Sequence, residues 1–192
     1  MNRNYLNIIM VLLFVAAVAS GCSKDTPSNP VRGKVYYEIR PGVDTTYTFS
    51  QAVFGDYGPQ DNDTIFDFDF RMVSLGIKTS KDTAIGTGNY INFKLESPNK
   101  LSPVPGIYKF KRKPTELGIN KIIFGEFYDS LNFQTGQFVR GDTITGGTLA
   151  FTKNGSGIIV TIDCTTQLGK ALKGTYAGDA TYYDFRGKKK KI

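Results

Sequence analysis

Residues 64–72 read TIFDFDFRM, and this stretch decides the fold class. Aromatic and charged side chains alternate along it, Phe66, Phe68 and Phe70 taking one set of positions and Asp67, Asp69 and Arg71 the other. Successive side chains of a β-strand point to opposite faces of a sheet. The alternation therefore predicts a strand whose phenylalanine face lies in the core and whose charged face is solvated, with Arg71 paired to the aspartates.

The same period of two, interrupted by turn residues, extends along the chain. Further strands are predicted at residues 31–39, 45–54, 73–77, 90–95, 107–111, 119–128, 133–139, 143–151, 158–164 and 171–183, the last as one strand or two. Residues 55–63 and 97–106 are rich in Gly, Pro and polar side chains and predict loops, and Asn154-Gly155 predicts a hairpin turn. No window of eleven residues keeps the apolar period of an amphipathic helix.

Composition points the same way. The chain has 14 Phe, 11 Tyr and 21 Gly, and only four of its 17 acidic residues are Glu, which favours helices. We therefore expect one all-β domain over residues 31–185, an antiparallel β-sandwich or an open barrel-like sheet of about ten strands. The chain has no His, which excludes His-based catalytic triads, zinc sites with His ligands and imidazole pH switches.

The first residues predict an export signal. Residues 8–19 (IIMVLLFVAAVA) are an apolar run of twelve, too short for a membrane-spanning helix of ~20 residues, and Arg3 precedes them. The run ends in Ala19-Ser20-Gly21-Cys22. This break resembles a bacterial lipobox, which implies that the Cys22 thiol receives diacylglycerol and becomes the new N-terminus. Ordinary cleavage after a small residue is the alternative.

The resulting organisation has four parts. Residues 1–21 are the lipoprotein signal peptide, 22–30 a flexible tether from the lipidated cysteine, 31–185 the β-domain and 186–192 a basic tail. Ser23 follows the cysteine instead of the Asp that retains enteric lipoproteins at the inner membrane. By that analogy, we expect an outer-membrane lipoprotein that faces the periplasm or the cell surface.

A second resemblance concerns the end of the chain. Residues 146–184 read GGTLAFTKNGSGIIVTIDCTTQLGKALKGTYAGDATYYD, in which a Gly-Thr strand, an Asn-Gly turn and a Gly-x-Tyr-x-Gly strand follow in order. Together with the lipobox, this pattern is similar to that of small all-β Bacteroidota envelope lipoproteins. Most of these are uncharacterised, so the resemblance implies a fold and a compartment only.

Three acidic or thiol features were weighed as chemical sites. Asp67 and Asp69 lie about 7 Å apart on one strand face, within the range of paired glycosidase carboxylates, but a solvated strand face gives the same spacing. The weak calcium candidates Asp56, Asp61 and Asp63 share a polar stretch that fails the EF-hand spacing, and turn formation explains them equally. Cys164 shares a face with apolar residues and is expected to be an inert core thiol.

Surface features give the remaining candidates. Four aromatic side chains are expected outside the core as a possible ligand surface: Tyr36, Tyr57, Tyr128 and Tyr183. The tail residues Lys188, Lys189, Lys190 and Lys191 are possible contacts to anionic lipid or lipopolysaccharide, with a solvated chain end as the alternative. Without the leader and this tail, residues 22–185 carry a charge of only +1, so no nucleic-acid partner is expected.

These observations favour a non-enzymatic, lipid-anchored envelope protein whose β-domain binds an unknown ligand. The expected partners are the membrane, through the lipid, and a glycan or protein of the envelope. We expect no cofactor and no metal. Two alternatives stay open: a carboxylate-based glycan hydrolase, which a pocket with two carboxylates from separate strands would favour, and a structural module of a surface or pilus-like assembly, which an uncovered edge strand would favour.

Overall fold

A computed structural model describes residues 31–59, 65–98, 105–110 and 120–186. All regular structure in these residues is β-strand, so the expectation of an all-β domain is confirmed. Among these residues, there is no helix long and apolar enough to cross a bilayer.

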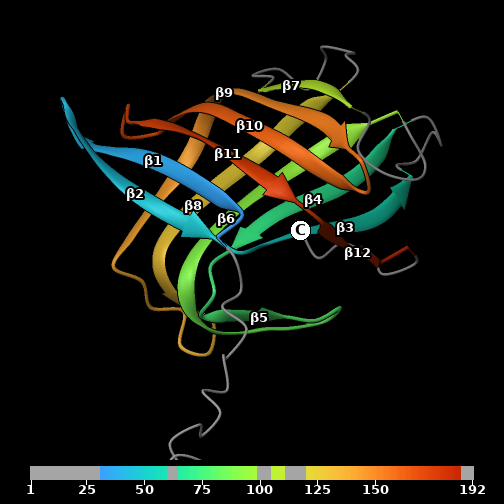
Figure 1. Cartoon of the computed structure of the whole chain (residues 1–192), viewed down its shortest axis with the longest axis horizontal. Coiled ribbons are helices and arrows are strands. Elements are labelled where there is room, and N and C mark those ends of the chain that lie inside the picture. The colour runs from blue at the N-terminus through green and yellow to red at the C-terminus, as the bar shows by residue number, and fades with distance from the viewer. Residues whose placement is uncertain (1–30, 60–64, 99–104, 111–119, 187–192) are drawn as a thin grey trace, which may run out of the picture.

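The described residues form twelve strands: β1 (Gly33–Arg40), β2 (Val43–Phe49), β3 (Gln51–Pro59), β4 (Phe66–Val73), β5 (Ile77–Thr79), β6 (Ala84–Ser97), β7 (Gly106–Phe110), β8 (Lys121–Asn132), β9 (Arg140–Asn154), β10 (Gly157–Thr166), β11 (Ala171–Gly178) and β12 (Ala180–Asp184). Eleven of them form one sheet in the order β12-β3-β4-β6-β8-β7-β9-β10-β11-β1-β2, and β5 pairs with β6. The sheet curls into an open half-barrel (Figure 1), which agrees with the barrel-like expectation rather than the sandwich. The pairings β12–β3 and β7–β8 are parallel, so the sheet is mixed and not purely antiparallel.

The two ends of this sheet are joined by chain crossings. β2 continues through Ser50 into β3, and β11 continues through Asp179 into β12, so the chain passes twice from one end of the strand order to the other. Tyr176 holds the crossing together because its hydroxyl accepts a hydrogen bond from the Ala52 amide (3.1 Å) and donates one to the Asp179 carbonyl (2.7 Å). This curl encloses one hydrophobic core.

The core lies inside the half-barrel and is largely aromatic. Phe66, Phe68 and Phe70 are all at most 4% exposed, which places the phenylalanine face of β4 inward, as the alternation predicts. Phe54 and Phe151 pack against the Phe70 ring, with centroids 5.1 and 5.2 Å away. Ring contacts of this kind add to the stability that burial provides.

Several predicted boundaries are wrong, for local reasons. The strand predicted at residues 45–54 breaks at Ser50, where the chain changes its place in the sheet, and the loop predicted at 55–63 is strand as far as Pro59. Residues 133–139 form no strand, because the Asn132 carboxamide accepts hydrogen bonds from the amides of Gln134 and Thr135 and so folds a turn. The stretch 171–183 divides into β11 and β12, and the strand predicted at 73–77 ends at Val73.

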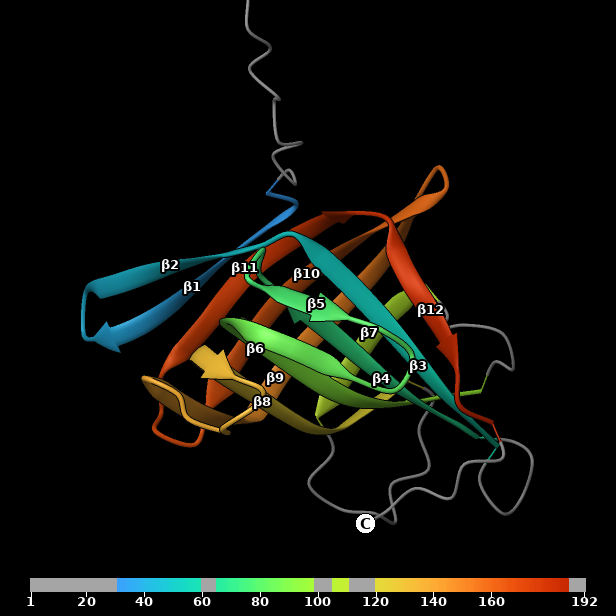
Figure 2. The same ribbon diagram turned by 90° about the horizontal axis from the view of Figure 1, so that it is seen from below.

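β6 begins six residues before its predicted start and carries the chain onto the outer face of the sheet. Figures 1 and 2 show its first part folded back with β5, so that residues 77–86 form a hairpin over the outer face of β3 and β4. We call these residues the β5–β6 hairpin. Two segments of the chain come very close at the base of this hairpin, where a Cβ on Gly86 (φ 101°) would lie 2.2 Å from the Gly76 carbonyl oxygen. Only glycine fits this backbone, and the fold-back creates a second layer outside the half-barrel.

Candidate functional site

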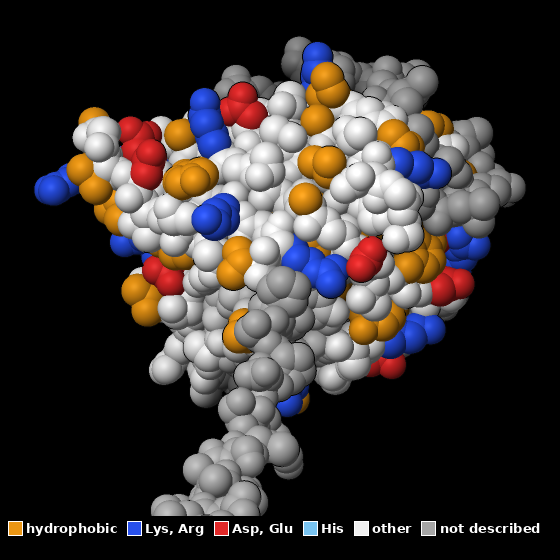
Figure 3. Space-filling model, viewed as in Figure 1, with side chains coloured by type: hydrophobic (Ala, Val, Ile, Leu, Met, Phe, Trp, Pro, Cys, Tyr) orange, Lys and Arg blue, Asp and Glu red, His pale blue; other side chains and the backbone are white. Residues whose placement is uncertain are grey.

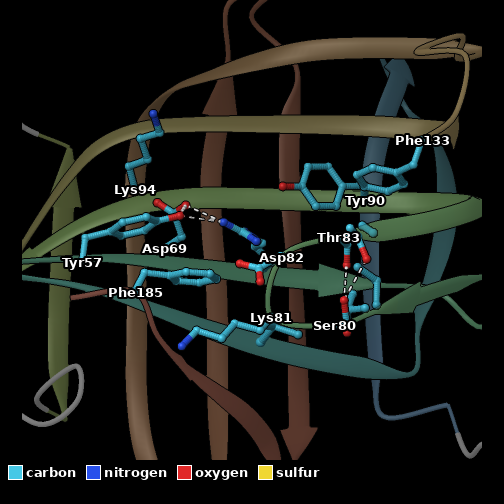
Figure 4. A pocket seen from close by; sticks show the side chains of 15 residues that line it. Tyr57, Asp69, Ser80, Lys81, Asp82, Thr83, Tyr90, Lys94, Phe133 and Phe185 are labelled. Carbon is cyan, nitrogen blue, oxygen red and sulfur yellow. Dashed lines mark hydrogen bonds and ion pairs between the residues drawn. The ribbon is translucent and has the colours of Figure 1, made fainter. Parts of the chain in front are cut away.

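A pocket of about 510 Å³ lies between this second layer and the outer face of the sheet. Its floor comes from β3, β4 and β6, and its cover from residues 79–84 at the tip of the β5–β6 hairpin (Figure 4). Phe185, which follows β12, and Phe133, which follows β8, complete the wall. The volume falls within the ~300–1,000 Å³ of small-molecule sites.

Hydrogen bonds hold the cover in place. The Thr79 hydroxyl donates to the Gln51 side-chain carbonyl (3.1 Å), and the Tyr183 hydroxyl donates to the Thr79 carbonyl (3.4 Å). Ile77 is 4% exposed and anchors the hairpin through its apolar side chain. The cover is therefore tied to β3 and β12, at one end of the strand order.

A charged cluster forms the centre of the floor. Arg71 Nη2 donates to Asp69 Oδ2 at 2.7 Å and also lies 3.0 Å from the Tyr57 hydroxyl oxygen. The Tyr57 hydroxyl in turn donates to Asp69 Oδ2 at 2.8 Å. The Asp69 side chain is only 6% exposed and that of Arg71 27%, so the ion pair is largely removed from water. Burial of this kind is costly unless every polar atom finds a partner.

Two atoms of the cluster have no such partner among the described residues. Asp69 Oδ1, an acceptor, and Arg71 Nε, a donor, are buried and make no hydrogen bond there. Both belong to residues that line the pocket. Unsatisfied buried groups each cost about 1–3 kcal/mol, which makes them unusual in a folded domain. In this structure protein atoms cover both, so they become a donor and an acceptor for a ligand only when a neighbouring side chain moves.

Two tyrosines add hydroxyl groups beside this pair. Burial, together with the charge of Asp69, raises the pKa of Tyr57 to about 12. Burial also raises the pKa of Tyr90, whose hydroxyl points across the pocket toward Asp69 in Figure 4. Both phenols therefore keep their protons at neutral pH and remain hydrogen-bonding hydroxyls.

Aromatic rings line two sides of the pocket. Tyr57 and Phe185 stack with centroids 5.2 Å apart and an interplanar angle of 16°. On another side, Tyr90 and Phe133 meet edge to face, also at 5.2 Å. Lys81, Asp82 and Lys94 contribute further charged groups to the lining, as Figure 4 shows. The arrangement combines aromatic surface with a few convergent polar groups, as ligand sites commonly do.

The structure separates the two carboxylates that the sequence suggested as a pair. Asp69 lines the pocket and Asp67 does not. The predicted ion pair to Arg71 is present for Asp69, but the prediction of a solvated face is wrong there, because the β5–β6 hairpin covers this part of β4. A second carboxylate does reach the pocket, from Asp82 in the turn of the hairpin.

The four candidate tyrosines do not form one surface. Tyr57 lies in the pocket and Tyr183 beside it, with its ring 6.3 Å from that of Phe185. Tyr36 is 45% exposed on β1, and Tyr128 packs against Phe138 in a separate hollow of the surface. Only half of this predicted ligand surface therefore belongs to the pocket region.

Asp56 is not in an open loop. It is fully buried in β3, where it accepts hydrogen bonds from the Gly58 amide (2.7 Å), Arg186 Nε (2.9 Å) and the Tyr182 hydroxyl. Arg186, assigned above to the basic tail, thus holds the end of β12 against β3 through its ion pair with Asp56. Among the described residues, no group of three or more Cys, Asp or Glu is placed to hold a metal ion.

The remaining sequence candidates fall into two groups. Cys164 is 2% exposed, and burial raises its thiol pKa to about 12, so it stays protonated and unreactive, as its core-facing position predicts. The others lie outside the described residues, namely Asp61, Asp63, Cys22, Lys188, Lys189, Lys190 and Lys191.

Sequence reasoning missed Tyr90, Asp82 and Phe185 as pocket residues. A usable signal lay in the glycines at positions 76, 86 and 88, whose spacing about a short turn allows a chain to fold back closely. A scan against protein-family models finds no match to this chain, and searches of curated proteins and of solved structures find none either. The arrangement of side chains in the pocket is therefore the observation from which function can be inferred.

Proposed function

We propose that this chain is a non-enzymatic, lipid-anchored protein of the cell envelope, held at the outer membrane, whose β-domain binds a small polar ligand in the pocket under the β5–β6 hairpin. The observation that carries the binding function is the buried Asp69–Arg71 pair, which leaves Asp69 Oδ1 and Arg71 Nε without partners among the described residues at the pocket floor. A preformed pocket with unsatisfied donors and acceptors is suited to recognition of a polar molecule.

The anchor rests on the sequence Ala19-Ser20-Gly21-Cys22 after the apolar run. We expect labelled palmitate to be incorporated into the full chain and Cys22→Ala to abolish incorporation and release the protein from membranes. Cys164→Ala is the matched control, because this buried core thiol is protected from modification. Equal labelling of wild type and Cys22→Ala would contradict the anchor.

Ligand binding is tested by a thermal-shift screen of the full chain against sugars, amino acids and short peptides. A ligand that binds the folded state raises the melting temperature by mass action. Asp69→Asn should reduce the shift, whereas Asp163→Asn, which alters an exposed carboxylate outside the pocket, should not. If no compound shifts the wild type, or if both variants respond alike, the pocket is not a binding site.

One observation favours the glycan hydrolase as a second candidate, namely that Asp69 and Asp82 reach the same pocket from different segments. Asp69 Oδ2, however, is held by Arg71 and Tyr57, so it is engaged in an ion pair and cannot also deliver a proton to a leaving group. Release of reducing sugar from oligosaccharides by wild type, lost in both Asp69→Asn and Asp82→Asn, would favour hydrolysis over binding.

The structural-module alternative has its own observation. Among the described strands, β2 pairs only with β1, and β12 only with β3, so each leaves one edge without a strand partner. Such edges can accept a strand from another protein. Concentration-dependent assembly of the full chain in analytical ultracentrifugation would support this alternative.

A further inference from the structure

The pocket also indicates which chemical class of ligand it takes. We propose that the ligand is a neutral carbohydrate, one of whose hydroxyl groups bridges Asp69 Oδ1 and Arg71 Nε. This inference rests on the proposed binding function and narrows it to one class of molecule.

The buried polar atoms of the pocket floor restrict the chemistry of the ligand. Asp69 Oδ1 needs a donor and Arg71 Nε needs an acceptor. The ion pair is made through the Nη2–Oδ2 contact, which leaves the other carboxylate oxygen of Asp69 and the Nε of Arg71 without partners. A hydroxyl group satisfies both at one oxygen, because it donates its proton to the carboxylate and accepts from the N–H. A carboxylate ligand offers acceptors only, and an ammonium group donors only.

The charged groups that line the pocket also restrict the ligand. Asp69 and Arg71 neutralise each other in a site where the Asp69 side chain is more than nine-tenths buried. A charged ligand group placed beside this pair would have to give up much of its hydration, and the further cation of the floor, Lys94, has its ammonium over the Phe124 ring, 5.9 Å from the centroid. A neutral polar group avoids this cost. The charged groups of Lys81 and Asp82, in the hairpin turn, are of opposite sign and serve a neutral ligand as donor and acceptor.

The aromatic rings that line the pocket suit the apolar faces of a sugar. A sugar ring has apolar C–H faces and polar hydroxyl edges, and C–H groups pack on the electron-rich faces of aromatic rings. Tyr57 and Phe185 line one side of the pocket, and Tyr90 and Phe133 another, with Asp69 between them (Figure 4). Such walls hold the apolar ring faces while the floor binds the hydroxyl groups. The volume of about 510 Å³ suits a ligand of this kind.

The test is calorimetric titration of the lipidated chain that begins at Cys22, held in detergent, with cellobiose, maltose, xylobiose and N,N′-diacetylchitobiose, preceded by an array of neutral oligosaccharides. We expect at least one to bind, and we expect Asp69→Asn to weaken it by at least about tenfold, since the neutral amide removes the charge that pairs with Arg71 and replaces one acceptor oxygen by a donor. Tyr90→Phe, which removes only a hydroxyl, should weaken binding by a smaller factor. Asp163→Asn and Tyr36→Phe, both outside the pocket, should remain within about twofold of wild type.

Asp69→Asn carries a risk to folding, so saturation-transfer NMR on Tyr90→Phe provides a second measurement, in which sugar C–H signals should lose intensity relative to wild type. Sugar binding that is equally strong in the two pocket variants and in the controls would overturn the inference. So would binding of dipeptides or amino acids in the pocket without any sugar, although the proposed binding function would then stand. If neither sugars nor peptides bind, both the inference and the proposed function fail.

Discussion

Replacing Asp69 by alanine probes the cluster on which the proposed site depends. The substitution removes a carboxylate that is 4% exposed and leaves Arg71 without its 2.7 Å partner. Breaking a fully buried ion pair costs about 3–5 kcal/mol, and Arg71 keeps about a quarter of its side chain in contact with solvent, so we expect the lower figure of about 2–3 kcal/mol. The matched control is Asp163→Ala, whose pair with Lys173 is more than 60% exposed on both sides and is worth at most about 1 kcal/mol.

Urea unfolding followed by circular dichroism measures the difference. With a denaturant slope of about 2 kcal/mol/M for a domain of this size, Asp69→Ala should lower the midpoint by about 1–1.5 M and Asp163→Ala by at most about 0.5 M. The double variant Asp69→Ala/Arg71→Met should recover part of the loss, because it removes the charge that the single variant leaves unpaired. Equal midpoints for Asp69→Ala and Asp163→Ala would show that the hairpin does not bury the pair in solution.

Further predictions concern the core, the base of the hairpin and the titrating tyrosine. Phe68→Ala should cost about 3–5 kcal/mol in the same unfolding assay, whereas Phe124→Ala, at a ring 36% exposed, should cost much less; similar losses would mean that the faces of β4 are misassigned. Gly86→Ala should increase hydrogen exchange in residues 77–86, because its Cβ meets the Gly76 carbonyl, whereas Gly146→Ala, with nothing within 4 Å, should leave exchange unchanged. The pKa of Tyr57 is raised to about 12 in the folded state from 10.0, so its contribution to stability is complete below pH 10 and is lost as the pH rises to 12. Tyr57→Phe should therefore make the unfolding free energy fall less steeply over that window, and an unchanged slope would contradict the assigned burial.

The architecture of the core could be predicted because its signal is local. Spacing alone indicates which face of the strand is apolar, and the three side chains on that face are buried in the structure, namely Phe66, Phe68 and Phe70. The Asn154-Gly155 turn is likewise found between β9 and β10, where Gly155 has a φ of 58°. Each of these signals depends on a few neighbouring residues, so the sequence suffices to read it.

The burial of the charged face of β4 could not be predicted from a short stretch of sequence. Asp69 and Arg71 look like solvent-facing residues in any short window, but in the structure Asp69 is buried, and both line the pocket together with residues 79–84 and Phe185. Phe185 reaches the pocket because β12 pairs with β3, a parallel pairing between segments about 130 residues apart. Strand pairing at that distance depends on the whole sheet, and no alternation in either segment specifies it.

Two buried polar atoms at the pocket floor bear on the stability of the domain. A domain of this size has a net stability of roughly 5–15 kcal/mol, and buried atoms without partners cost about 1–3 kcal/mol each. Asp69 Oδ1 and Arg71 Nε have no partner among the described protein groups, and each carries this cost unless water or a ligand supplies a hydrogen bond. An apolar pair of similar volume at positions 69 and 71 would avoid this penalty without altering the half-barrel, since both side chains point away from its core. In the binding function that we propose, a polar ligand that satisfies both atoms removes this penalty, and the stabilisation contributes to the binding free energy.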